Sequence, residues 1–197
     1  MKNKLKIKDL VMMSLSLAII IVCSKISIPI GPIPITLQTF SVFIVALILG
    51  SKKSAIVFST YIILGLIGLP VFSTGGGFSY IYMPSFGFII GFLAGGIITG
   101  LGSKSNKFYV KYITSMIGLL IINIFGVLYM FIIFNFYKGA NKDLLYILEI
   151  GVAPFIIKDI FVVILSCIIY SRLKPVLHKE EKEVILDKVY NIEKGAE

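Results

Sequence analysis

The stretch at residues 109–136, YVKYITSMIGLLIINIFGVLYMFIIFNF, decides the fold. It contains a single charged residue, Lys111, and it is longer than the roughly 20 helical residues that cross the hydrocarbon core of a bilayer. The whole chain agrees, with 57% hydrophobic residues, 15% charged residues and a mean hydropathy of +0.99. A soluble domain of 197 residues cannot bury that much apolar surface. The sequence therefore predicts an integral membrane protein.

Five further apolar stretches flank this one, so we expect an all-α bundle of six transmembrane helices. The last apolar run begins near Leu144 and is too long for one span, and Pro154 divides it because proline favours the first turn of a helix. The part before this proline, residues 144–151, is predicted to be a short interfacial piece. The domain is predicted at residues 1–174, with a polar tail at 175–197. The other five spans are predicted at residues 10–26, 36–50, 54–72, 86–101 and 154–170.

The charges of the connections predict the orientation. Basic residues lie before the first span, at Lys52 and Lys53, at Lys104 and Lys107, and after the last span, whereas connections 28–35 and 73–85 carry no charge. Only Lys138 and Lys142, near Asp143, break this alternation. Cytoplasmic loops are rich in lysine and arginine, so both termini are expected in the cytoplasm. The first apolar stretch is too long for a signal-peptide core and lacks a small-residue cleavage site, so it is predicted to remain as a span.

The first uncharged connection, IPIGPIPI at residues 28–35, is expected to be stiff. Its three prolines fix φ and exclude the helical region for the residues before them. It leads into Thr36, Gln38 and Thr39, whose side chains can hydrogen-bond a neutral polar ligand. We interpret this connection as a rigid wall of a binding site.

The second uncharged connection combines glycines with aromatic residues. Gly75, Gly76 and Gly77 permit hinge motion, and Tyr80 and Tyr82 follow them. This combination predicts a lid over a small ligand that is partly apolar and partly polar. The alternative is that the tyrosines belong to the aromatic belt at the membrane interface.

Lys158 and Asp159 are adjacent charges at the start of the last span, where charge is costly. Neighbouring helix positions point about 100° apart, so the two are not expected to face each other. At least one should contact a ligand, another helix or the outer surface, and Asp159 is the better candidate for a buried role because lysine can extend to the interface. Bonding between helices is the alternative, and it is the usual role of a mid-span polar residue such as Asn123.

No catalytic, metal or cofactor site is expected. The chain has no G-x-x-x-x-G-K-[ST], H-E-x-x-H or G-x-S-x-G motif, and its one histidine, His178, lies in the polar tail. Cys23 and Cys167 lie in apolar runs without ligand-like neighbours. The net charge of +9 comes from clusters between spans, which is not the pattern of a nucleic-acid-binding protein.

Four motifs together resemble the BioY family, the biotin-capturing S-components of energy-coupling-factor (ECF) transporters. The resemblance covers about residues 10–172, and the ordered set is more specific than any one motif. The motifs are PITLQT at 34–39, LGLIGLPVF at 64–72, MPSFGFIIGF at 83–92 and PFIIKD at 154–159.

The resemblance implies a multi-pass subunit of the bacterial plasma membrane that binds biotin and docks to a transmembrane coupling protein driven by two cytoplasmic ATPases, which alone bind ATP. The small residues Ser14 and Ala18 would form the docking site, with packing inside the bundle as the alternative. The biotin ureido ring would suit Asp159, and its carboxylate would suit Lys158. The other expected binding residues are Thr36, Gln38, Gly75, Gly76, Gly77, Tyr80, Tyr82 and Phe86.

Three other functions stay open at this stage. The chain could be an S-component for a different small vitamin, an accessory membrane protein without a ligand, or an intramembrane enzyme. Biotin binding to the purified protein separates the first two from the leading hypothesis, and turnover without partners would indicate the third.

Overall fold

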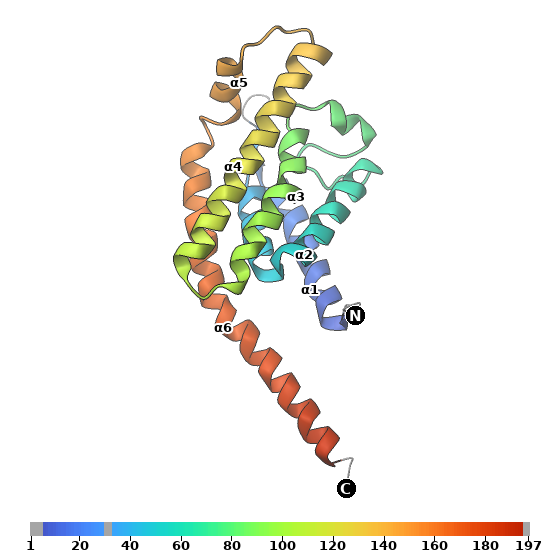
Figure 1. Cartoon of the computed structure of the whole chain (residues 1–197). Helices are drawn as coiled ribbons and strands as arrows, with labels where there is room; N and C mark the ends of the chain where they lie inside the picture. Colours follow the sequence, from blue (N-terminus) through green and yellow to red (C-terminus); the bar gives the residue numbers. More distant parts are fainter. Residues whose placement is uncertain (1–5, 30–32, 195–197) are drawn as a thin grey trace.

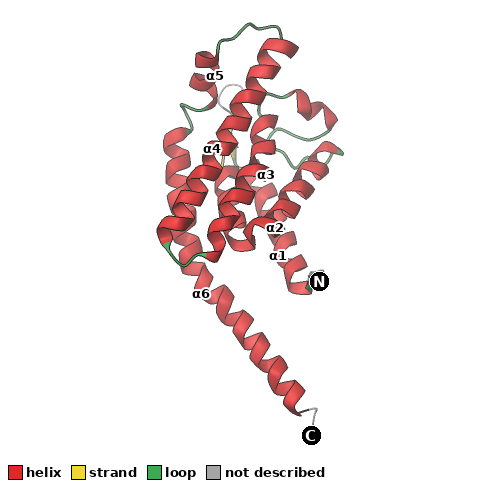
Figure 2. Ribbon diagram, viewed as in Figure 1, coloured by secondary structure: helices red, strands yellow, loops and turns green. Residues whose placement is uncertain are grey.

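The computed structural model describes residues 6–29 and 33–194, with side chains described as far as Leu177, and its described part is almost entirely helical (Figures 1 and 2). A two-residue antiparallel pair, β1 with β2, places Ser27 opposite Thr36. The elements in chain order are α1 (Ile7–Lys25), β1 (Ser27–Ile28), β2 (Ile35–Thr36), α2 (Gln38–Leu66), the 3-10 helix η1 (Phe78–Tyr82), α3 (Phe86–Leu101), the 3-10 turn η2 (Gly102–Lys104), α4 (Phe108–Ile132), the π-helical turn η3 (Ile133–Tyr137), α5 (Leu144–Gly151) and α6 (Ile156–Lys194).

Among the residues that the structure describes, five helical segments are long and apolar enough to cross a membrane: Ile7–Lys25, Gln38–Leu66, Phe86–Lys104, Phe108–Tyr137 and Ile156–Leu177. Large apolar side chains on the outside of α4 are exposed, including Leu120 at 60% and Leu128 at 57%. Lipid, not water, is the solvent that such a surface suits. The chain is a multi-pass membrane protein.

Gly50 reverses the direction of α2. It has φ 72° and ψ 171°, which glycine adopts at little cost because it lacks Cβ. The Gln38 amide donates to the Tyr61 hydroxyl at 2.9 Å although the residues are 23 positions apart. A straight helix would separate them by about 35 Å. Residues 38–49 and 51–66 are therefore two antiparallel arms, and Figure 1 shows the reversal below the α2 label.

The two arms differ from the predicted helices 36–50 and 54–72 at the turn and at the far end. The connection is the single residue Gly50 rather than a loop at 51–53. The second arm ends at Leu66 because Gly68 has φ 111° and Pro70 has no amide hydrogen for a helical bond. By contrast, the predicted boundaries of α3 and α5 are confirmed.

Close packing of glycines joins α3 to α4. A Cβ on Gly91 would meet the backbone of Ile122, and a Cβ on Gly95 would collide with the carbonyl oxygen of Gly118. Small residues four apart let two backbones approach closely, as is common between membrane helices. This contact fixes the wall of the site described below.

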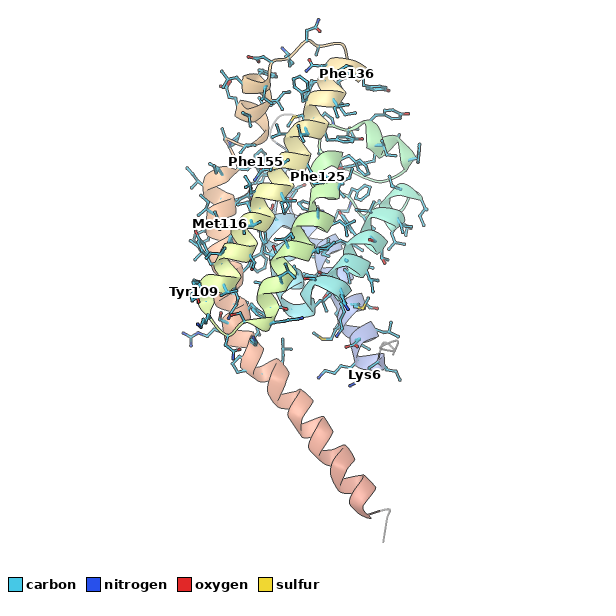
Figure 3. All side chains as sticks on the ribbon, viewed as in Figure 1. Lys6, Tyr109, Met116, Phe125, Phe136 and Phe155 are labelled. Carbon is cyan, nitrogen blue, oxygen red and sulfur yellow. The ribbon has the colours of Figure 1, made fainter. Side chains whose placement is uncertain are left out.

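Both termini lie at the same end of the bundle (Figure 1). Lys6 and Tyr109 lie at that end, whereas Phe136 lies at the opposite one (Figure 3). We call the end that contains Lys6 and Tyr109 the terminal end, and the end that contains Phe136 the α5 end. The last span begins at Ile156 instead of Pro154, which lies in a turn, and the helix runs through Pro175 to Lys194, well beyond the predicted end near Tyr170.

Candidate ligand-binding site

A cleft lies toward the α5 end between the first arm of α2, α3, α4 and α6. It contains about 590 Å³ of empty space, which includes solvent space at its open side. The rings of Phe88, Phe92 and Phe155 form an apolar wall, and Figure 3 labels Phe155 on the upper part of the chain beside α6. The polar lining comes from Thr36, Gln38, Thr39, Ser73, Tyr80, Ser85, Asn123, Lys158 and Asp159.

Asp159 and Lys158 form an ion pair at this cleft. Lys158 Nζ lies 2.8 Å from Asp159 Oδ1, and the two side chains are 28% and 9% exposed. The prediction that these neighbours could not face each other is wrong, because the four-carbon lysine stem bends back to the next residue. The ammonium also lies 3.5 Å from the carbonyl oxygen of Thr36, so Lys158 links α6 to β2.

The Asp159 carboxylate keeps unused acceptor capacity. The Lys158 ammonium is close to Oδ1 but poorly aligned, and within the described part of the chain Oδ1 has no hydrogen-bond donor. The Thr39 hydroxyl lies within reach of the same carboxyl group. Because buried polar atoms are almost always hydrogen-bonded, a carboxylate oxygen that is ion-paired but has no aligned hydrogen-bond donor favours a ligand N–H as an additional partner.

Gln38 is held in place by the protein interior. Its Nε2 donates to the Tyr61 hydroxyl, which donates in turn to the carbonyl oxygen of Val71 at 3.0 Å. One of its two amide N–H groups is used in this way, which leaves the other N–H and the amide oxygen for a ligand. The Thr36 hydroxyl, in β2 just before the helix, accepts a bond from the Gln38 backbone N–H at 3.3 Å.

The three glycines do not line the cleft, and backbone hydrogen bonds close the loop that contains them. Gly77 N–H donates to the Gly65 carbonyl at 2.7 Å, and Gly75 and Phe72 exchange two backbone hydrogen bonds. A Cβ on Gly76 would collide with the Leu69 carbonyl. Gly76 therefore permits tight packing against Leu69, Gly75 and Gly77 adopt φ of 139° and 108°, and the loop brings Ser73 and Tyr80 to the cleft.

Gly76→Val should lower the stability of the fold. The added side chain must displace the Leu69 backbone, and overpacking of this kind costs about 1–3 kcal/mol. Thermal unfolding in detergent, followed by circular dichroism, measures the effect. Ser79→Val adds comparable bulk to an exposed position of the same loop and serves as the control. Equal unfolding temperatures for the two variants would contradict the packing role.

Tyr82 and Phe86 also lie outside the cleft lining. The Tyr82 ring is stacked on Tyr137 with centroids 4.7 Å apart, and Tyr82 is 46% exposed, which suits an interfacial aromatic residue. Phe86 is buried and packs against Tyr80 and Phe72, with both centroid distances 6.3 Å. It supports a cleft residue without reaching the cleft itself.

Several lining residues were not predicted from the sequence. Phe88, Phe92 and Phe155 belong to apolar runs in which periodicity does not separate a ligand wall from a lipid face. Asn123 could be recognised in the sequence as a polar residue in mid-span. Its Nδ2, however, donates to the Leu119 carbonyl of its own helix at 3.0 Å instead of to a neighbouring helix.

Residues 1–179 match the model of the BioY family. The chain belongs to the BioY family. A relative from Thermotoga maritima, "Biotin transporter BioY", is 35% identical over 169 residues, covering 85% of this chain and 96% of the relative. A Pyrococcus horikoshii relative, "Probable biotin transporter BioY", is 37% identical over 171 residues, covering 86% and 98%.

A solved structure has the same fold. It is described as the S-component for biotin from an ECF-type ABC transporter, and it matches with a TM-score of 0.76 at 28% identity, covering 89% of this chain and 95% of the other. The BioY family is a family of transporter components and not of enzymes. The resemblance read from the four motifs is thereby confirmed.

Proposed function

We propose that this chain is the high-affinity biotin-binding subunit of an ECF-type uptake transporter. The observation that carries the proposal is the buried Asp159 carboxylate at a cleft wall, which is ion-paired with Lys158 but has no aligned hydrogen-bond donor on Oδ1 among the described residues. The match to relatives named as biotin transporters, which covers 85–86% of this chain and 96–98% of the relatives, supports the choice of ligand.

Biotin has chemistry that suits each part of the cleft. Its ureido ring offers two N–H donors and one carbonyl acceptor, so a ureido N–H can donate to Asp159 while Gln38 or Asn123 completes the polar contacts. The apolar ring and side chain of biotin suit the wall formed by Phe88, Phe92 and Phe155. Its carboxylate is an acceptor for the Lys158 ammonium, which forms an ion pair with Asp159 when the cleft is empty.

The transport role requires a membrane orientation. We assign six crossings, with residues 38–49 and 51–66 of α2 counted separately, and both termini in the cytoplasm of a bacterial plasma membrane. The basic connections near Gly50 and at residues 102–107 lie at the terminal end, which supports this orientation. The cleft then opens toward the outside, where biotin is captured.

The energy source in this proposal lies in partner subunits. The chain has no Walker A motif, so ATP would be bound and hydrolysed by two cytoplasmic ATPases that act through a transmembrane coupling protein. Ser14 and Ala18 are exposed on α1 and are not packed inside the bundle. Their exposure supports docking of the coupling protein over the alternative of internal packing.

Binding of labelled biotin to the purified protein in detergent tests the proposal. We expect saturable binding of one biotin per chain, and a hundredfold excess of thiamine, riboflavin or folate should displace less than half of it, because none of these combines a ureido ring with an apolar carboxylate chain. Stronger competition by another vitamin would assign the chain to that vitamin. Absence of binding to every vitamin would favour an accessory membrane protein.

A further inference from the structure

Tyr61 lies behind the ligand cleft, where it contacts the cleft residue Gln38 without belonging to the cleft lining itself. Its side chain is 1% exposed, and its ring packs edge-on against Phe72 with centroids 5.3 Å apart. A phenylalanine would pack in the same way, and a buried hydroxyl group costs free energy unless it is hydrogen-bonded. The hydroxyl group is therefore expected to have a role that the ring does not have.

The Tyr61 hydroxyl joins its two partners in a fixed direction. It has a single hydrogen, which it donates to the Val71 carbonyl oxygen at 3.0 Å, and that oxygen can only accept. Toward Gln38 the hydroxyl presents a lone pair, so it selects the amide nitrogen Nε2, which lies 2.9 Å away. A reversed Gln38 amide would require Tyr61 to give up its bond to Val71. The hydroxyl thus fixes which amide atom faces it.

Val71 anchors this chain of hydrogen bonds in the loop that follows α2. Its carbonyl oxygen also accepts a bond from Ser24 Oγ at 2.7 Å, and its two lone pairs accommodate both donors. Val71 is buried, so water does not readily replace the Tyr61 hydroxyl if that bond is lost. The direction of the chain is therefore held by α1, α2 and the loop together.

With Nε2 held by Tyr61, the amide oxygen of Gln38 faces away from that residue. Gln38 lines the cleft, and among the described residues no donor is bonded to its Oε1. Thr39, the next residue along the chain, reaches the Asp159 carboxyl group, so the two acceptors belong to the same part of the cleft. The cleft therefore offers a ligand an amide oxygen beside a carboxylate.

We infer that Tyr61 is a positioning residue that makes the cleft specific for a ring with two N–H donors. One donor pairs with Asp159, and the other pairs with the Gln38 amide oxygen, which Tyr61 holds in place. A ureido ring has both donors, so the inference rests on the proposed function and deepens it. Without the Tyr61 hydroxyl the Gln38 amide is free to reverse and to offer its nitrogen in place of its oxygen.

Tyr61→Phe tests the inference through binding of labelled biotin to the full-length purified protein. Biotin affinity should fall about fivefold, which corresponds to the loss of one buried hydrogen bond. Tyr170→Phe is the matched control, because the Tyr170 hydroxyl also donates to a buried carbonyl, that of Ser103 at 2.8 Å, but lies outside the cleft lining. This control should change biotin affinity less than about twofold. An equal loss of affinity in both variants would overturn the inference.

A second substitution separates the orientation of Gln38 from packing around Tyr61. Gln38→Met removes the amide group but keeps the length of the side chain. In this background Tyr61→Phe should change biotin affinity less than about twofold, because no amide is left to orient. A further loss of the same size as in the single Tyr61→Phe variant would mean that the hydroxyl acts independently of Gln38, which would overturn the inference.

Two carbamate analogues of biotin, each with one ureido N–H replaced by oxygen, test the specificity without any substitution. Each should bind the unmodified protein at least about tenfold more weakly than biotin, because its ring oxygen meets an acceptor. For the analogue whose oxygen faces Gln38, Tyr61→Phe should reduce the preference for biotin about fivefold, since a reversed amide donates to that oxygen. An analogue that binds as tightly as biotin would overturn the inference even if Tyr61→Phe does not fold.

Failure of the proposed function would give a different result. If the unmodified protein binds no biotin, both the proposed function and the role of Tyr61 are excluded. If the unmodified protein binds biotin and Tyr61→Phe binds both biotin and the carbamate analogues with unchanged affinities, only the role of Tyr61 is excluded.

Discussion

Asp159→Asn is expected to weaken biotin binding about 100-fold while the protein stays folded. Asparagine has nearly the same shape, so the start of α6 should be kept. The substitution replaces the one carboxylate in the cleft lining with a neutral amide. A ureido N–H then loses a charge-assisted acceptor whose side chain is only 9% exposed. Equilibrium binding of labelled biotin in detergent measures the loss.

Glu149→Gln provides the matched control for this substitution. Glu149 is exposed on α5 and lies outside the cleft lining, so removal of its charge should leave biotin affinity within about twofold. Lys158→Ala is a second test of the site beside Asp159→Asn, because it leaves the Asp159 carboxylate without its ammonium partner. Undiminished affinity in both Asp159→Asn and Lys158→Ala would remove these residues from the proposed site.

The sequence predicts the spans well where hydropathy and charge agree. The α3 helix, Phe86–Leu101, lies between Pro84-Ser85 and a basic connection, and the structure confirms its predicted ends. The predicted break between residues 50 and 54 locates the turn inside α2, but a single glycine, Gly50, makes this turn in place of the expected loop. The φ of 72° at Gly50 depends on the approach of α3, whose Gly100 packs against the Ser51 backbone. That approach is a tertiary contact and is not encoded locally.

The site was predictable where polar residues interrupt apolar sequence. Thr36, Gln38, Tyr80, Lys158 and Asp159 all line the cleft that the structure contains. The role of the glycines was not predictable, because the residue type permits both a hinge and close packing and only neighbouring atoms decide between them. The Lys158–Asp159 pair was missed for a related reason: helix geometry fixes the direction of Cβ but not the path of a long side chain.

The anchoring of α1 bears on the docking face. Near the α5 end the Ser24 hydroxyl donates to the Val71 carbonyl at 2.7 Å, and the Lys25 ammonium donates to the Phe72 carbonyl. Near the terminal end Asp9 pairs with Lys53 of α2. Because both ends of α1 are tied to the rest of the bundle, changes on its exposed middle should leave the ligand cleft undisturbed.

Ser14→Leu combined with Ala18→Leu is expected to lower biotin uptake by the assembled transporter between tenfold and a hundredfold. The free-energy cost of overpacking at a close helix contact corresponds to a change of this order. Both side chains are exposed, so biotin binding by the isolated chain should stay within about twofold. Leu15→Phe adds bulk at an exposed position about 100° around the same helix and should preserve uptake.

Uptake by membrane vesicles that contain all subunits, measured beside binding to the purified chain, separates docking from capture. Normal uptake by the double leucine variant would exclude this face of α1 as the docking site, whereas a parallel loss of binding would mean that the substitutions disturb the fold. Lost uptake with intact binding is the result that the exposed small residues of α1 predict.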